Sequence, residues 1–255
     1  MLMMLALACK DPVDAEDVTT ENGMDLNTLT AYLFREWDNE DPAIMVTGID
    51  DLETIAADFP ADSSNYAERS FEGVQALSAD DVSDVELSHG YNPSDAGGVG
   101  ILYQSAHPLA EHVELFSMVD QTVIEPASPV YERTIVEGGD CFPAGDCQTM
   151  LSENDVQRKN ILIDTEHQIT KTWRWVELED GRKAVAGRTW QPALADSDKE
   201  DKIFQNYSVE LWIPTDTGTL RFLNTWSENS FQFADTLILS SINDALNAAE
   251  DYLAE

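Results

Sequence analysis

The segment that most constrains the fold is the last one, "FADTLILSSINDALNAAEDYL", residues 233–253. Its apolar residues keep helical spacing for about five turns, so one face of a long helix is apolar. These residues are Ala234, Leu237, Ile238, Ser241, Ile242, Ala245, Ala249 and Tyr252. Such a helix has to bury that face, and the preceding segments have the composition of strands. We therefore predict that a C-terminal helix packs on a sheet.

Strand and helix patterns alternate before that helix. Residues 99–106, "VGILYQSA", predict a strand, residues 107–121 a helix, and residues 130–137 another strand. Five further strands are predicted at 160–166, 169–178, 183–190, 206–213 and 219–228. The glycine-rich and cysteine-containing stretch 138–159 is expected to interrupt this succession.

Two short turns indicate that the sheet is antiparallel. "EDGR" at 179–182 and "TDTG" at 215–218 have the composition of hairpin turns. In the strand 206–213, Tyr207, Val209, Leu211 and Ile213 alternate with Asn206, Ser208 and Glu210. We expect the apolar set, together with Leu220, Phe222 and Trp226 of the next strand, to form the inner face, and the polar set to be largely in water.

The N-terminal third predicts helices instead. Leu26, Leu29, Leu33 and Trp37 share one helical face. A second helix is expected from Pro42 to Ile55, with a break at Gly48, and a short one within 77–85, capped by Ser78. Residues 24–97 are therefore expected to form a mainly helical extension that packs against the sheet domain.

Composition limits the class of partner. The 255 residues are 43% hydrophobic, with six Trp, and can fill one large core. Asp and Glu number 49 against 14 Lys and Arg, which gives a formal charge of −35. Nucleic acid and anionic headgroups are poor partners for such a surface. We favour a saline habitat, where counterions screen the repulsion, over an acidic functional patch. Beyond residue 8, no apolar run approaches the roughly 20 residues of a membrane-spanning helix.

The opening segment resembles the lipobox of bacterial lipoproteins. Apolar residues 2–8, "LMMLALA", precede Cys9, and small Ala8 occupies the position that processing enzymes prefer. The segment is shorter than a typical signal peptide and has no basic residue before it. A start codon further upstream would add the missing length and the missing basic residue. The resemblance implies cleavage before Cys9 and lipidation of Cys9, with the acidic residues 9–23 as a tether. Lys10 implies an outer membrane. The alternative is an apolar terminus with an incidental thiol.

The two other cysteines, Cys141 and Cys147, lie in the tight loop "GGDCFPAGDC". They can form a disulfide that stabilises the loop by roughly 2 kcal/mol, and an exported protein would then keep Cys9 for the lipid. A zinc site is the competing use of the pair, but no further His or Cys lies nearby at usable spacing.

The order of elements from 99 to 254, with "SAHPLAEHVELFSMVDQTVIEP" at 105–126, resembles the START-like (SRPBCC, helix-grip) superfamily. This resemblance implies an α+β fold in which a curved antiparallel β-sheet grips the long C-terminal helix. The expected organisation is a signal-like segment at 1–8, a tether at 9–23, a mainly helical extension at 24–97 and a START-like domain at 98–255.

The resemblance also implies an apolar cavity between the sheet and the C-terminal helix. The expected ligand-binding residues are Tyr131, Trp173, Trp175, Tyr207, Leu211, Phe222, Trp226, Ile238 and Ile242. The alternative is that these side chains form a closed core, which is the commoner role of aromatic residues at such spacing. A volume above about 300 Å³ would favour binding.

No catalytic motif is found. His107 and His112 are five residues apart, whereas the zinc-binding helices place two histidines four apart, so no metal and no cofactor are expected. Arg174, Arg188 and Arg221 occupy successive strand candidates. They either pair with carboxylates such as Glu177 or Glu210, or meet an anionic headgroup at the cavity mouth.

Together these features predict a lipid-anchored extracytoplasmic protein of the cell envelope that binds a lipid or another hydrophobic small molecule without catalysis. The membrane would be reached through the lipid anchor only, and no nucleic acid is expected. An envelope or surface interaction protein with a filled core is the alternative, and a hydrolase or cyclase acting inside the cavity is the third.

Overall fold

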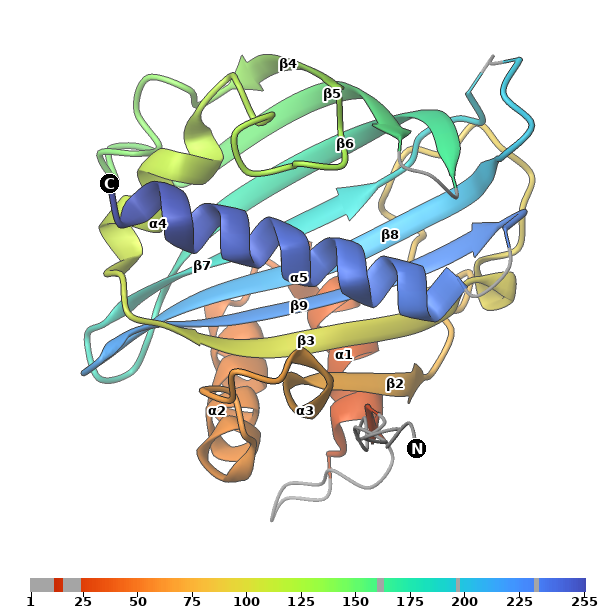
Figure 1. Cartoon of the computed structure of the whole chain (residues 1–255). Helices are drawn as coiled ribbons and strands as arrows, with labels where there is room; N and C mark the ends of the chain where they lie inside the picture. Colours follow the sequence, from red (N-terminus) through yellow and green to blue (C-terminus); the bar gives the residue numbers. More distant parts are fainter. Residues whose placement is uncertain (1–11, 16–23, 160–162, 196–197, 232–233) are drawn as a thin grey trace, which may run out of the picture.

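A curved nine-stranded sheet forms the centre of the computed structural model, which describes residues 12–15, 24–159, 163–195, 198–231 and 234–255 (Figure 1). The strand order is β1-β2-β3-β9-β8-β7-β6-β5-β4. The strands are β1 (Val13–Asp14), β2 (Ser70–Val74), β3 (Gly97–Ser105), β4 (Val130–Glu137), β5 (Thr149–Lys159), β6 (Asp164–Glu177), β7 (Lys183–Trp190), β8 (Ile203–Thr215) and β9 (Gly218–Asn229). Every neighbouring pair is antiparallel except β1 and β2, which are parallel.

The long C-terminal helix α5 (Ala234–Leu253) lies across the concave face of this sheet (Figure 1). Leu239, Ile242 and Leu246 of the helix pack against Val99 and Ile101 of β3. The predicted α+β arrangement, a curved sheet that grips the last helix, is therefore confirmed.

The opposite, convex face is covered by the N-terminal helices α1 (Leu26–Arg35), η2 (Glu36–Asp38) and α2 (Pro42–Asp58) (Figure 1). The carboxylates of Asp25 and Asp41 cap the two α-helices by accepting from backbone N–H groups at 2.6 and 3.0 Å. Both predicted helices are confirmed. The expected break at Gly48 is wrong, because α2 is continuous through this residue. Gly48 instead allows α1 to pack closely, since a Cβ there would lie 2.7 Å from the Leu33 side chain.

A large apolar core joins these helices to the sheet. The fully buried Phe34 makes edge-on contacts with Tyr207 and Trp226, with ring centroids 5.9 and 5.8 Å apart. Leu211 and Phe222 belong to the same cluster. The extension is thus packed on the sheet through the apolar side chains of β8 and β9.

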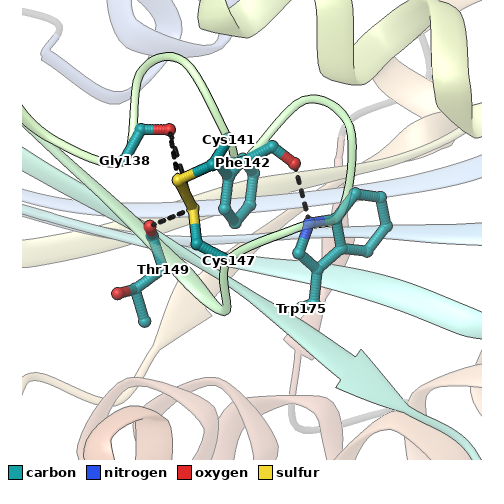
Figure 2. The surroundings of a disulfide bond; sticks show 6 residues. All are labelled: Gly138, Cys141, Phe142, Cys147, Thr149 and Trp175. Atoms are coloured by element: carbon teal, nitrogen blue, oxygen red, sulfur yellow. Dashed lines mark hydrogen bonds between the residues drawn. A yellow bond between two sulfur atoms is a disulfide. The ribbon is translucent and has the colours of Figure 1, made fainter.

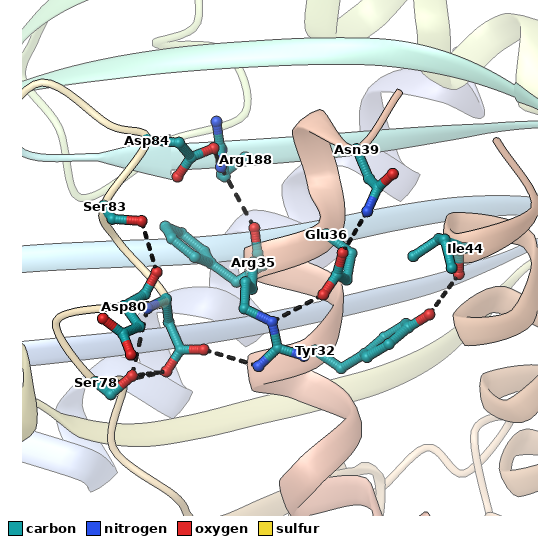
Figure 3. Close-up of polar contacts among 12 residues, drawn as sticks. Tyr32, Arg35, Glu36, Asn39, Ile44, Ser78, Asp80, Ser83, Asp84 and Arg188 are labelled. Carbon is teal, nitrogen blue, oxygen red and sulfur yellow. Dashed lines mark hydrogen bonds and ion pairs between the residues drawn. The ribbon is translucent and has the colours of Figure 1, made fainter. Parts of the chain in front are cut away.

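Polar contacts hold α1 and the loop 78–84 over the same face (Figure 3). The Arg188 guanidinium, 4% exposed, donates to Asp84 at 2.6 Å and lies over the Phe34 and Trp37 rings. Arg35 donates to Asp81 at 3.0 Å. Removing the partner of a buried cation is costly, so the Arg188–Asp84 pair holds the loop in place, whereas Arg35 is 45% exposed and its pair contributes less.

The shorter elements are α3 (Tyr66–Arg69), η3 (Pro93–Asp95) and α4 (Leu109–Ser117). The helix expected within 77–85 is wrong: the segment forms turns. Ser78 and Asp81 bond to each other's backbone N–H at 3.3 and 2.8 Å, so this capping pattern closes a turn and no helix follows. The helical extension also contributes β2, a strand that the sequence analysis missed.

Two strand predictions are corrected. The stretch 138–159 does not only interrupt the sheet, because β5 occupies Thr149–Lys159 and pairs with β4. Residues 160–162 of the strand expected at 160–166 lie outside the described residues, and its described part and the strand expected at 169–178 belong to one long strand, β6. The strands expected at 130–137, 183–190, 206–213 and 219–228 are confirmed.

The signal-like segment, most of the tether and Cys9 lie outside the described residues. In the part of the chain that is described, no helix has the length and apolar character needed to cross a membrane.

Replacing Phe34 with Ala is expected to lower the free energy of unfolding by about 3–5 kcal/mol, because the ring fills the core between α1 and the sheet. Urea unfolding measures this change. Tyr252→Ala, at a 40% exposed position near the end of α5, is the control and should change the value by less than about 0.5 kcal/mol. Equal effects of the two changes would contradict the assignment of Phe34 to a shared core.

Candidate functional site

In the middle of β8, the side chains that point toward α5 are polar. Asn206, Ser208 and Glu210 line a space under the helix, whereas Tyr207 and Leu211, which alternate with them, are in the core on the other face. The sheet is therefore covered on both faces. The alternation itself was predicted correctly, but the polar side is enclosed instead of facing water.

The first cavity, of about 140 Å³, lies between α5 and strands β5, β6, β8 and β9. Its apolar wall comes mainly from the helix and strand ends, and its polar wall from the sheet. The apolar residues are Ala127, Ile163, Ile169, Ile203, Leu223, Phe231, Leu237, Ile238, Ile242 and Ala245. The polar residues are Glu125, Arg158, His167, Lys171, Thr189, Asn206, Ser208, Glu210, Thr225, Ser227 and Ser241.

A second cavity, of about 90 Å³, continues toward α4. It shares Glu125, Lys171, Glu210, Leu223, Ile242 and Ala245 with the first cavity. Its further residues are His112, Leu115, Phe116, Gln121, Ile124, Arg133, Trp173, Trp212, Arg221, Leu246 and Ala249. The two spaces meet at Lys171 and Glu210, whose charged atoms are 3.8 Å apart.

The charges in these cavities influence one another strongly. Burial disfavours the charged form of Lys171, but Tyr131, Glu210 and Glu125 outweigh it and raise the pKa of Lys171. Burial lowers the pKa of the Arg221 guanidinium, against the opposing effect of the nearby carboxylates. A guanidinium starts so far above neutral pH that it keeps its proton in proteins, so Lys171 and Arg221 are both cationic at pH 7.

Polar contacts tie α5 to the sheet on either side of the cavities. Arg158 of β5 donates to Ser241 of the helix at 2.9 Å. From α3, Arg69 donates to Asn243 at 2.8 Å and lies over the ring of Tyr103. Burial and the neighbouring Glu250 carboxylate raise the pKa of Tyr103 to about 12, so its phenol stays protonated.

The histidines make local contacts. His107 bonds to Glu111 at 2.9 Å, and the buried His112 bonds to the Ser105 hydroxyl at 2.9 Å. Burial lowers the pKa of His112 and of His167 to about 3, so both rings are neutral at pH 7. Within the described ranges, no three His, Cys, Asp or Glu side chains are grouped in a way that could hold a metal ion.

A disulfide joins Cys141 and Cys147 (Figure 2). It closes the loop between β4 and β5, and Trp175 donates to the Phe142 carbonyl at 3.0 Å. The Phe142 ring is thereby held in the cluster that contains Phe116 and Trp173. The predicted pairing of the cysteines is present, and the loop packs over an aromatic wall of the site.

The expected ligand-binding residues divide into three groups. Trp173, Ile238 and Ile242 line the cavities. Trp175 packs under the disulfide loop, and Tyr131 packs with Val156 and Ile169.

The third group is Tyr207, Leu211, Phe222 and Trp226, which the sequence analysis placed on the helix side of the sheet. The structure places them on the convex face, in the core with α1 and α2. The reason is that the N-terminal helices bury the more apolar face of β8 and β9. The expectation that these four residues line the cavity is therefore corrected.

The three strand arginines do not form one row. Arg174 lies over Trp37, and Arg188 pairs with Asp84, both on the convex face. Arg221, in contrast, lines the second cavity. Sequence reasoning missed Arg133, Lys171 and Glu210 as cavity residues. The strand pattern gave no signal for them, because eight of the 14 Lys and Arg residues lie in strands and several of these are on the other face or in water.

The chain has the architecture of a helix-grip fold, in which a curved sheet surrounds a long C-terminal helix. No protein-family model and no curated protein matches this chain. A STAR-related lipid transfer protein fragment from Xanthomonas axonopodis is similar in structure, with 10% identity and a TM-score of 0.48, over 63% of this chain and 88% of that one. A protein of Thermus thermophilus has 12% identity and a TM-score of 0.42, over 62% and 97% of the two chains. Human StAR-related lipid transfer protein 5 has 9% identity and a TM-score of 0.40, over 64% and 76%. These are likenesses of fold and extend no further.

The buried neutral histidines predict a loss of stability in acid. Because the pKa of His112 is lower in the folded chain than the ordinary value of 6.5, the unfolded chain binds the proton first. The contribution of neutral His112 to the free energy of unfolding is complete above about pH 6.5. It is lost as pH falls toward 3, by up to roughly 1 kcal/mol per pH unit. Urea unfolding at pH 7.5 and 5.0 should show a smaller loss for His112→Gln than for the parent. The same loss in both proteins would contradict a neutral, buried His112.

Proposed function

We propose that the domain binds a small hydrophobic or amphipathic molecule in the two joined cavities under α5, without catalysis. The observation that carries this proposal is the space between α5 and the sheet, which is partly open to solvent. Protein interiors are close-packed and leave few voids larger than a water molecule. In this chain, spaces of about 140 and about 90 Å³ remain between α5 and the sheet, and both are lined by Lys171 and Glu210.

The volumes limit the size of the ligand. Even together they fall short of the lower bound of about 300 Å³ for drug-sized pockets. A dry cavity of about 150 Å³ is large enough for benzene. The cavities thus suit a ligand with one short chain or one ring, and a two-chain membrane lipid would require α5 to move.

The second candidate is an envelope interaction protein whose sheet and helix only make a solid core. The volumes lie below the roughly 300 Å³ of drug-sized pockets, and it is the charged groups that line the cavities that favour the binder. The two candidates are separated by whether anything occupies the cavities.

Native mass spectrometry of protein purified from its own host tests the proposal. We expect a small molecule of uniform mass to be retained by the parent and lost in Ala245→Phe, because Ala245 lines both cavities and a ring there fills them. The matched control is Ala248→Phe on the same helix. Ala248 lines neither cavity, so this variant should retain the ligand. If the purified parent carries no ligand and added amphiphiles do not raise its unfolding temperature, the proposal is wrong.

The proposed setting is the cell envelope, with Cys9 as the lipid attachment point and an outer membrane as the destination. Pairing of Cys141 with Cys147 supports this, because the third cysteine is then outside that disulfide. A disulfide also favours an extracytoplasmic location.

Metabolic labelling with a fatty acid tests the anchor. The parent and Cys147→Ser, which lacks a loop cysteine, should both incorporate label, and Cys9→Ser should incorporate none. Equal labelling of Cys9→Ser and the parent would rule out this attachment point.

A further inference from the structure

The cavities hold an unusual share of the positive charge of the chain. Only 14 residues are Lys or Arg, against 49 Asp and Glu. Four of the basic residues line the cavities, together with two carboxylates: Arg133, Arg158, Lys171 and Arg221, with Glu125 and Glu210. In a chain of charge −35, the space under α5 is thus lined by more cations than carboxylates.

The two carboxylates are each paired with a different cation. Glu210 lies 3.8 Å from Lys171, and Glu125 lies 3.4 Å from Arg158. Neither Arg133 nor Arg221 forms a salt bridge with a carboxylate in the described part of the chain. The excess charge therefore resides on these two guanidinium groups, and both line the second cavity.

Arg133 is held in place by neutral groups. Its Nε donates to Asn154 at 2.8 Å, and its Nη1 donates to the carbonyls of Phe116 and Met118 at 2.6 and 3.0 Å. The guanidinium lies over the Trp173 ring at 5.3 Å. These contacts orient the group, and they leave its charge uncompensated.

Arg221 has fewer contacts. Its guanidinium lies over the Trp212 ring, 5.7 Å from the centroid. Among the residues that the structure describes, no oxygen accepts a hydrogen bond from it, and the nearby Glu210 and Glu250 act on it only at longer range. Arg221 is only partly buried, so its donors can meet water or a ligand, and a carboxylate matches the planar guanidinium with two parallel hydrogen bonds.

We infer that the ligand is a small amphipathic carboxylate, whose anionic group binds Arg221 in the second cavity near Arg133. Its apolar part passes the Lys171–Glu210 pair into the first cavity, toward Ile238 and Ile242. This inference rests on the proposed function and names its class of ligand. The lack of an acceptor for Arg221 among the described residues and the excess of cations both support it.

The test uses three probes with the same tail: octanoate, octanol and octylamine, titrated calorimetrically into the full chain at pH 7.5. We expect octanoate to bind about tenfold more tightly than octanol or better, because a charge-assisted hydrogen bond adds to the burial of the tail. Octylamine should bind more weakly than octanol. Since the comparison uses the parent protein, it does not depend on the folding of any variant.

Variants then locate the effect. Arg221→Gln should reduce the affinity for octanoate to that for octanol and leave octanol unchanged, and Arg221→Lys should keep part of the preference. Arg174→Gln, which removes a guanidinium on the opposite face of the sheet, is the matched control and should bind as the parent does.

The outcomes separate the two proposals. If octanol binds as tightly as octanoate, the carboxylate inference is overturned and ligand binding stands. If Arg221→Gln keeps the preference for octanoate, Arg221 is not the anchor and the inference is overturned. If none of the probes binds to the parent and its purified form is ligand-free, both proposals fail.

Discussion

Packing of the N-terminal helices on the convex face of the sheet is the constraint on which the rest of the structure depends. Phe34 of α1 lies among Tyr207 and Trp226, and this contact buries the apolar sides of β8 and β9. Burial of large aromatic side chains is the dominant stabilising term available to such a domain. Because the convex face supplies that stability, the concave face does not need to be apolar. It can carry polar side chains and still be enclosed by α5.

The enclosed polar face has its own requirement, since a buried charge without a partner is costly. Most charged groups under α5 have a nearby partner. Lys171 pairs with Glu210, and Arg158 contacts Glu125 and Ser241. Arg133 has only neutral acceptors, and Arg221 is the cation under α5 for which the described residues supply no hydrogen-bond acceptor. A sheet stabilised from its other side can tolerate such a group, and the same group makes the space selective.

Most elements of the fold could be predicted from the sequence, because they rest on local patterns. The spacing in α5, the cap at Asp41 and the alternation in β8 each specify an element with few alternatives. β5 could not be found in this way, since its enclosed side mixes Met150, Ser152 and Asn154 and shows no apolar alternation. The cavity was harder still. Alternation shows that a strand has two different sides, but it does not show which side meets which layer when both faces of a sheet are covered.

The distribution of charge also decides how an anion could reach the site. The acidic surface repels anions, but this repulsion acts through water and is screened beyond about 8 Å at physiological salt. The contacts inside the cavity are partly desolvated and are screened much less. Added salt therefore weakens the external barrier more than the internal attraction. In a saline habitat, a chain of charge −35 can keep an anion-binding site that a dilute medium would render hard to enter.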